Sequence, residues 1–195
     1  MHRILFTSVE AGAAAVFLIP IYYCLNRYKF RSISTTIAAF FFSLYLCTVY
    51  AMVGLPNITY VRFHPNFNYI PFRYFFSDIS SLLNVILFIP LGLFLPVLRS
   101  RFQKTGFTVL FGFLMSLFIE FFQIFTMRAS DINDLITNTV GTILGFFLGR
   151  FLLRYCPSLT LSEERNELKT ICVTALTVMF FLQPFLSKLV WKFIL

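Results

Sequence analysis

The chain has 195 residues, of which 58% are hydrophobic, 19% aromatic and only 12% charged. Its mean hydropathy is +0.82, and soluble domains have roughly 25% charged residues, so a soluble globular protein is excluded. The net charge of +8 comes from lysines and arginines between long apolar runs, which is typical of membrane anchors and not of a nucleic-acid-binding surface. The length suits a single membrane domain over residues 1–195.

The apolar runs predict an all-α polytopic transmembrane helical bundle of about six spans. The sixth run is the weakest, because it contains Gln183 and Pro184 and is followed by Lys188 and Lys192. An interfacial position for that run, which leaves five spans, is the alternative. The expected spans are residues 8–25, 35–53, 81–98, 107–127, 132–153 and 171–187.

Lysines and arginines between the spans predict the orientation of the chain. The loops after the first, third and fifth spans hold ten of these residues, and the opposite side holds six. Because basic residues gather on the cytoplasmic side of a membrane, both termini and the second and fourth loops are expected outside the cytoplasm. The loop at 54–80 lies on that outer side and is rich in Phe and Tyr. Such a composition favours the headgroup level of the bilayer.

Three polar residues in the fourth span, Ser116, Glu120 and Gln123, are spaced by four and three positions. This spacing places them on one helical face. An ionisable group at the centre of a span costs about 2.5 to 3.5 kcal/mol on insertion scales. We therefore expect this face to meet a neighbouring helix and not lipid.

A second polar face is predicted on the following segment, where Asp131, Asp134, Asn138, Gly141 and Gly145 follow one another at three- and four-residue steps. Small residues four apart allow close approach of transmembrane helices. Gly141 and Gly145 are therefore expected to pack against a neighbour. The acidic groups lie at the start of this helix, where the helix dipole stabilises negative charge.

The short link at 128–130 makes these two segments antiparallel neighbours, so their polar faces can meet near the outer surface. Within the link, Ser130 is the expected helix cap. The third span adds Asn84 at its outer end, and Pro90 and Pro96 are expected to bend that span. The residues expected to converge in an outward-facing ligand-binding pocket are Asn84, Ser116, Glu120, Gln123, Arg128, Asp131, Asp134 and Asn138.

Four ordered sequence motifs carry a family resemblance. They are NYIPF at 68–72, NVILFIPLGLFLP at 84–96, SLFIEFFQ at 116–123 and DINDLITNTVGTILG at 131–145. Together they closely resemble the VanZ family of bacterial membrane proteins, with a VanZ-like core at about 68–149. The resemblance implies a multi-pass protein of the bacterial cell membrane and an association with resistance to the glycopeptide teicoplanin. It implies no mechanism.

Two classes of function fit the predicted cluster. In the first, a non-enzymatic membrane protein binds or modulates a cell-envelope amphiphile, such as a lipid-linked cell-wall intermediate or a lipoglycopeptide, with membrane lipids as its other partners and without a cofactor. Amide and carboxylate groups would contact the polar part of the ligand, and the aromatic loop its apolar part. The acidic groups would also accept hydrogen bonds from an ammonium group.

The second class is an enzyme acting on a lipid-linked cell-wall phosphate. Glu120, Asp131 and Asp134 would then serve as the catalytic candidates, holding Mg²⁺ or Mn²⁺ through oxygen ligands. The cluster contains no His or Cys, so zinc is not expected and a carboxylate would have to act as the base. A lipid transporter with a broken third span at Pro90, Gly92 and Pro96 is a further alternative.

Overall fold

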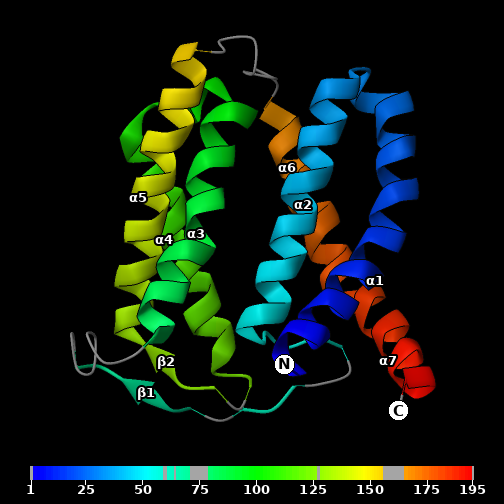
Figure 1. The fold of residues 1–195 in the computed structure, drawn as a ribbon, viewed down its shortest axis with the longest axis vertical. Coiled ribbons are helices and arrows are strands. Elements are labelled where there is room, and N and C mark those ends of the chain that lie inside the picture. The colour runs from blue at the N-terminus through cyan, green and yellow to red at the C-terminus, as the bar shows by residue number, and fades with distance from the viewer. Residues whose placement is uncertain are drawn as a thin grey trace. The chain divides into compact units, whose positions relative to one another are not determined.

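The structure is a computed structural model that describes residues 2–58, 61–63, 65–70, 79–126, 128–155 and 165–194. Within these ranges, six helical stretches are long and apolar enough to cross a membrane, which confirms the predicted all-α transmembrane bundle. The chain divides into two compact units (Figure 1). Unit 1 comprises Met1–Val61 and Glu164–Leu195, and unit 2 comprises Arg62–Glu163. The VanZ-like motifs all lie in unit 2.

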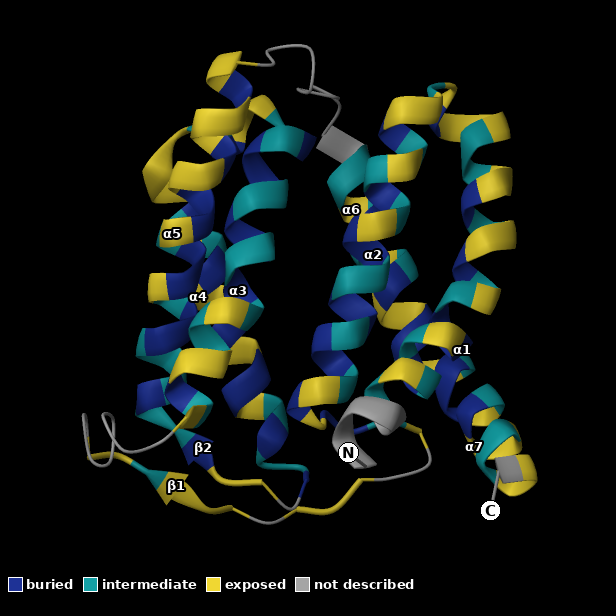
Figure 2. Cartoon of the chain, in the orientation of Figure 1, coloured by how far each residue is buried: buried dark blue, intermediate teal, exposed yellow. Residues whose placement is uncertain are grey.

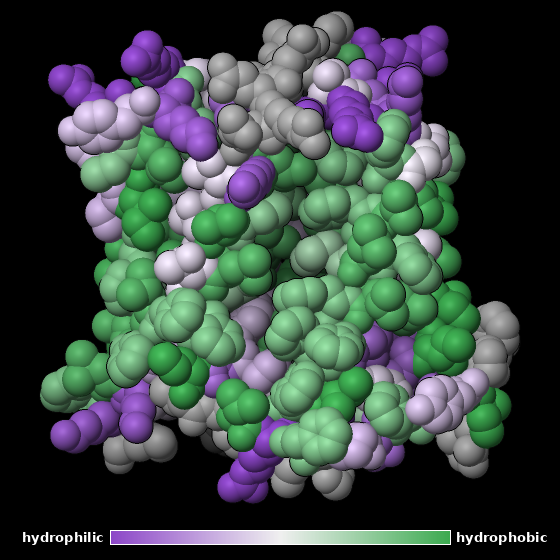
Figure 3. Space-filling view, turned by 180° about the vertical axis from the view of Figure 1, so that it is seen from behind, coloured by the Kyte–Doolittle hydropathy of each residue, from purple (hydrophilic) through white to green (hydrophobic). Residues whose placement is uncertain are grey.

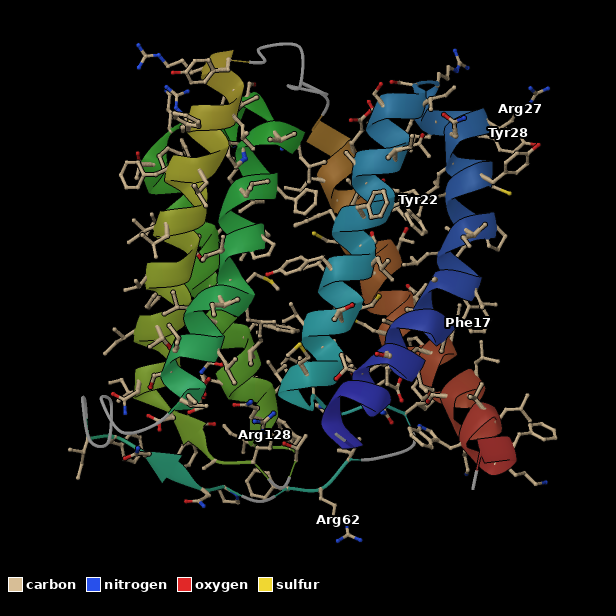
Figure 4. The ribbon with its side chains drawn as sticks, in the orientation of Figure 1. Phe17, Tyr22, Arg27, Tyr28, Arg62 and Arg128 are labelled. Atoms are coloured by element: carbon tan, nitrogen blue, oxygen red, sulfur yellow. The ribbon has the colours of Figure 1, made fainter. Side chains whose placement is uncertain are left out.

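Unit 1 begins with helix α1, His2–Leu25, which continues into a π-helical turn, η1, at Asn26–Phe30. Arg31 ends this turn in the left-handed conformation (φ 51°), and its N–H donates to the Asn26 carbonyl. Helix α2, Ile33–Val53, follows and is capped by the Ser32 hydroxyl, which accepts the Thr35 N–H at 3.4 Å. The two antiparallel helices α1 and α2 are joined in their core by a hydrogen bond of 2.6 Å between the Tyr22 and Ser43 hydroxyls. Figure 4 shows Tyr22 pointing from α1 toward α2.

The C-terminal part of unit 1 is one long helical stretch with an irregular turn inside it. Helix α6, Arg165–Thr177, leads into a π-helical turn, η4, at Val178–Leu182, and helix α7 covers Gln183–Ile194. The stretch Glu167–Phe193 meets the requirements for a span. This favours six spans over five. Pro184 does not break the helix, although a proline has no N–H for the carbonyl four residues earlier.

Unit 2 contains three long helices: α3, Ile79–Leu98, α4, Thr105–Gln123, and α5, Ile132–Tyr155. A short 3-10 helix, η2, at Ser100–Gln103 joins α3 to α4. Two strands of two residues each, β1 at Phe67–Asn68 and β2 at Ser130–Asp131, pair in parallel. Helix α4 ends four residues before the expected end of the fourth span, because the Ile124, Phe125 and Thr126 N–H groups bond three residues back in a tighter turn.

Helices α3 and α5 run parallel and are in backbone contact. A Cβ atom added to Gly141 would lie 2.2 Å from the Val85 carbonyl oxygen, and one added to Gly145 would lie 2.0 Å from that of Ile89. Real Cβ atoms never come so close, so only glycine fits at either position. The prediction that Gly141 and Gly145 pack against a neighbouring helix is confirmed, and α3 is that neighbour.

Side-chain exposure in each unit follows the membrane pattern. Figure 2 shows buried residues on the faces that the helices of a unit turn to one another and exposed residues on the outer faces. The exposed positions include large apolar side chains such as Leu114, Phe147 and Phe151. In Figure 3, hydrophobic side chains cover the middle of the helices and hydrophilic ones gather at the helix ends. An apolar exterior of this kind suits lipid as the solvent.

Candidate functional site: a polar ladder between two spans

The connection from α4 to α5 is built around Glu120. The carboxylate oxygen Oε2 of Glu120 accepts the backbone N–H of Asp131 at 2.8 Å. The Ser130 hydroxyl donates to the Glu120 backbone carbonyl at 2.6 Å. Glu120 is only 8% exposed. One acidic residue of α4 therefore holds the chain where α5 begins.

Asp131 is the cap of α5. Its Oδ1 accepts the N–H of Asn133 at 2.8 Å, which is the second residue of the helix, and this is the usual bond of an N-cap aspartate. The expectation that Ser130 caps the helix is wrong, because Ser130 lies one residue too early and its hydroxyl donates to α4 instead. Asp131 itself belongs to β2, so the continuous helical face predicted from Asp131 onward starts at Asp134.

Deeper in unit 2, α4 and α5 stay in contact at residues of α4 that are four positions apart, Gly112, Ser116 and Glu120. The side-chain N–H of Asn138 donates to the Ser116 hydroxyl at 2.8 Å, and both residues are buried. One step further, a Cβ atom on Gly112 would lie 2.3 Å from the Thr142 hydroxyl oxygen. We call the residues Gly112, Ser116, Glu120, Asp131, Asn138 and Thr142 the polar ladder.

Two buried acceptor atoms of the ladder have no hydrogen-bond donor among the residues that the structure describes. They are Oε1 of Glu120 and Oδ1 of Asn138. A buried polar atom without a partner is unfavourable. The polar ladder therefore has unused capacity to accept hydrogen bonds.

Charged residues surround Glu120. Asp134, Asp131 and Arg128 all interact with it electrostatically. Asp134 is half-buried in the first turn of α5, whereas Arg128 is exposed. Figure 4 labels Arg128 at the end of unit 2 where α4 and α5 are connected. The cluster predicted from sequence thus brings Glu120, Asp131, Asp134 and Arg128 together.

The remaining predicted residues are placed differently. Gln123 is buried at the end of α4, and its backbone carbonyl accepts the Thr126 hydroxyl at 2.9 Å. Asn84 is half-buried on α3 next to Val85, whose carbonyl lies against Gly141. In the described part of the chain, no hydrogen bond joins Asn84 to the polar ladder. Its membership of the cluster stays a prediction.

Asn68 is a member of the cluster that the helical periodicity did not predict. Its side-chain N–H donates to Oδ2 of Asp131 at 2.9 Å. Asn68 is the first residue of the NYIPF motif, so the sequence does mark it. It lies in a loop, however, and a loop residue has no helical face from which its neighbours can be deduced. Through Asn68, the loop before α3 reaches the start of α5.

The same loop is fixed to the α4–α5 connection by its backbone. Arg62 donates its N–H to the Phe125 carbonyl, and Ser130 donates to the Asn66 carbonyl, both at 2.9 Å. The rings of Phe63 and Phe125 lie 5.8 Å apart. Residues 62, 63, 66 and 68 of this loop therefore lie beside the α4–α5 connection. Residues 71–78 lie outside the described ranges, so the expected role of the loop stays a prediction.

The metal and transporter alternatives each expect a particular arrangement of residues, which can be compared with the structure. Among the described residues, no group of three or more His, Cys, Asp or Glu side chains is arranged to hold a metal ion. Both carboxylate oxygens of Asp131 accept N–H donors. Helix α3 runs unbroken from Ile79 to Leu98 through both of its prolines, so the broken third span expected for a transporter is not present.

The fold and the ladder define a class: a multi-pass helical membrane protein with an acid-containing polar network between two of its spans. A sequence profile described as VanZ/LLP1 matches residues 42–154, which is more than half of the chain. The chain belongs to this family, as the motifs indicated.

A curated relative is Protein VanZ of Enterococcus faecium, which is 50% identical over 68 residues. That stretch covers 33% of this chain and 40% of the relative, so the similarity spans less than half of either protein. No solved structure matches the chain.

Proposed function

We propose that the polar ladder and the loop attached to it bind the polar part of a cell-envelope amphiphile at the extracytoplasmic face of the membrane. The observation that supports this most directly is the pair of buried acceptors without donors, Glu120 Oε1 and Asn138 Oδ1. An amphiphile with amide, hydroxyl or ammonium donors would satisfy them. The lipid-linked intermediates of cell-wall synthesis and the lipoglycopeptide antibiotics both carry such groups.

The orientation rests on the distribution of charge. The ladder lies at the end of unit 2 that includes the 128–131 connection, and this end belongs to the side with six basic residues. The side with ten includes the turn at Ser100–Gln103. The positive-inside rule supports an extracytoplasmic ladder.

The loop contributes the apolar half of the proposed interaction. Phe63 and Tyr69 are each 70% exposed, although the backbone beside them is tied to α4 and α5. Exposed aromatic rings on a fixed backbone suit contact with acyl chains or ring systems at the membrane interface. An amphiphile would then meet aromatic rings in the loop and acceptors in the ladder.

The biological role that we propose is modulation of the response to glycopeptides, on the basis of family membership. The resemblance links the VanZ family to teicoplanin resistance, and a relative bears the name Protein VanZ. A membrane protein that engages a lipid-linked cell-wall intermediate or the antibiotic itself would change how much free target or drug is present at the membrane.

The test is a teicoplanin dose curve in a susceptible Gram-positive host that expresses the chain at known membrane abundance. We expect the wild-type chain to raise the inhibitory concentration and Asn138→Leu at matched abundance to lose most of this effect. Gly106→Ala is the control, because nothing lies within 4 Å of an added Cβ at that position. A wild-type chain without effect on the dose curve contradicts the resistance role.

Direct binding is measured separately. The purified protein is reconstituted with a lipid-linked cell-wall intermediate or with teicoplanin, and the shift in unfolding temperature is recorded. A stabilised wild type and an unchanged Asn138→Leu variant support the binding site. Equal shifts in the unfolding temperature of the wild type and Asn138→Leu would mean that the ligand binds outside the polar ladder.

A further inference from the structure

Unit 1 contains a second buried acid, remote in sequence from the polar ladder. Glu10 of α1 lies opposite Gln183, the first residue of α7. The side-chain N–H of Gln183 donates to Oε2 of Glu10 at 2.8 Å. The exposed fractions are 8% for Glu10 and 2% for Gln183. Neither residue belongs to the motifs of the family.

The environment of this pair is apolar. Ala13 and Ala14 are buried on α1 beyond Glu10, and Val178 and Met179 are buried before Gln183. Two amides would hold the helices together equally well without a charge. An acid inside a span marks a functional position unless its charge is needed for packing, and the structural role of this pair does not require the carboxylate.

One hydrogen-bond acceptor atom of the pair has no donor within the described ranges. Oε1 of Gln183 is buried and has no hydrogen-bond partner in the described part of the chain. The side-chain N–H of Gln183 makes the bond to Glu10, so the carbonyl oxygen of the same amide takes no part in that bond. Besides this bond, Glu10 makes no hydrogen bond or ion pair with a residue that the structure describes. The Glu10 carboxylate thus accepts a hydrogen bond from one uncharged donor among the described residues, the Gln183 side-chain N–H.

The backbone around Gln183 is irregular. The π-helical turn Val178–Leu182 comes directly before it, and Pro184 comes directly after it. Pro184 has no N–H for the Phe180 carbonyl, and that carbonyl accepts the N–H of Ile58 at 3.4 Å instead. π-helical turns occur frequently at functional sites. This turn fixes Gln183 opposite Glu10 within unit 1.

We infer that Glu10 and Gln183 form a second binding site, and that its ligand is a primary ammonium group. The acceptors that the pair leaves for a ligand are the Glu10 carboxylate and the Gln183 amide oxygen, and a primary ammonium carries three donors and no acceptor. One carboxylate and one amide are too few oxygen ligands for Ca²⁺ or Mg²⁺. Lys188, the next cation on α7, is exposed, and within the described ranges Glu10 forms no ion pair, so we assign the ammonium to a ligand.

The position of Glu10 indicates two sources for this ammonium group. Helix α1 begins at His2, and Glu10 lies about two turns into it, 20 residues before Phe30, where the π-helical continuation of α1 ends. Because about 20 residues cross the hydrocarbon core, Glu10 lies near the level of lipid headgroups when Phe30 lies at the opposite surface. The headgroup of phosphatidylethanolamine and a small free amine both present the same donor. The choline headgroup of phosphatidylcholine carries a charge without N–H donors and serves as the discriminating comparison.

The test compares the unfolding temperature of the purified full-length chain in micelles doped with phosphatidylethanolamine or with phosphatidylcholine. The variants are Glu10→Gln and Gln183→Met, and Gly106→Ala is the control because it lies in unit 2, outside the polar ladder, with nothing within 4 Å of its added Cβ. Lipid titrations should show about tenfold tighter binding of phosphatidylethanolamine to the wild type, the value of one charge-assisted hydrogen bond. Both unit 1 variants should lose this preference, and Gly106→Ala should keep it.

A parallel titration with methylammonium chloride distinguishes the sources. Stabilisation by methylammonium alone indicates a free amine as a sufficient ligand, and stabilisation by the lipid only indicates a headgroup. The inference is overturned if the wild type responds to neither probe, or if Glu10→Gln retains the full preference. If Glu10→Gln does not accumulate, a full preference in Gln183→Met overturns it. A preference that survives in both unit 1 variants overturns this inference and leaves the role proposed for the polar ladder intact.

Discussion

The carboxylate of Glu120 accepts the backbone N–H of Asp131 at 2.8 Å, so an acid of one span fixes the peptide at which the next span begins. The bond uses only Oε2, and Oε1 of the same carboxylate has no donor among the described residues. Glu120 therefore combines a structural contact with an unused acceptor. The two roles can be separated by substitution.

Glu120→Gln is expected to accumulate normally in the membrane and to lose activity. A glutamine oxygen still accepts the Asp131 N–H, whereas the ionisable carboxyl group near Arg128 is removed. The measurement is the teicoplanin dose curve at matched membrane abundance. Normal abundance with full activity would refute a functional role for the charge, and parallel loss of abundance and activity would indicate a structural role only.

Asp131→Asn and Asp134→Asn are expected to have unequal, graded effects. Asparagine caps a helix about as well as aspartate, so Asp131→Asn should retain most of its stability. Asp131→Ala removes the cap and should cost about 0.5 to 2 kcal/mol. The measurements are the unfolding free energy and the dose curve for each variant. If both asparagine variants are inactive and lose a copurifying divalent ion, the Mg²⁺ or Mn²⁺ enzyme alternative replaces the binding role.

Gly145→Ala is expected to destabilise the chain, because the new Cβ would lie 2.0 Å from the Ile89 carbonyl. Separating two helices that are in backbone contact should cost about 1 to 3 kcal/mol or more. Gly106→Ala is the matched control, with no atom within 4 Å of its Cβ. Both are compared by their unfolding temperatures in one detergent, and equal temperatures would contradict the packing of α3 on α5.

Cysteine labelling tests the orientation. Ala129→Cys lies at the exposed α4–α5 connection, and Lys104→Cys lies at the exposed start of α4. In a chain whose own cysteines are all replaced, the exposed Cys24 among them, a membrane-impermeant maleimide should label position 129 and spare position 104 in intact cells. The reverse pattern would place the polar ladder at the cytoplasmic face and would remove the basis for a surface ligand.

Helical periodicity predicted the spans and the polar faces of α4 and α5, but not the contacts that loop residues make with them. Each apolar run and each polar face depends on residues three or four apart, and such spacing is visible in sequence. The faces of α4 and α5 and the close packing at Gly141 and Gly145 were found in this way. The bonds from Asn68 to Asp131 and from Gln183 to Glu10 join residues 63 and 173 positions apart. No local pattern encodes such pairs.

The helix cap shows a second limit. Ser130 and Asp131 are both good capping residues by type, and only the exact start of α5 at Ile132 decides between them. Helix ends vary by one or two residues with small changes in context. Here the context is Glu120, which binds the Asp131 N–H and the Ser130 hydroxyl at once through its carboxylate and its carbonyl.

Asn68→Asp is expected to release the loop before α3 from the start of α5. The side-chain N–H of Asn68 donates to Oδ2 of Asp131 at 2.9 Å, and an aspartate would place two carboxylates together in place of that bond. Repulsion between the carboxylates adds to the lost hydrogen bond. Asn68→Ala should have a smaller effect, since it removes the bond without adding charge. Asn66→Ala is the control, because Asn66 holds the loop through its backbone carbonyl.

Limited proteolysis of the membrane-embedded protein measures the release, since the loop at 61–70 is cut faster when its attachment is lost. The rates should fall in the order Asn68→Asp, Asn68→Ala, Asn66→Ala, with the last equal to the wild type. Equal rates for all four proteins would mean that the backbone bonds from Arg62 and Ser130 hold the loop without the help of Asn68. A faster cut with an unchanged teicoplanin dose curve would separate the loop from the function proposed for the ladder.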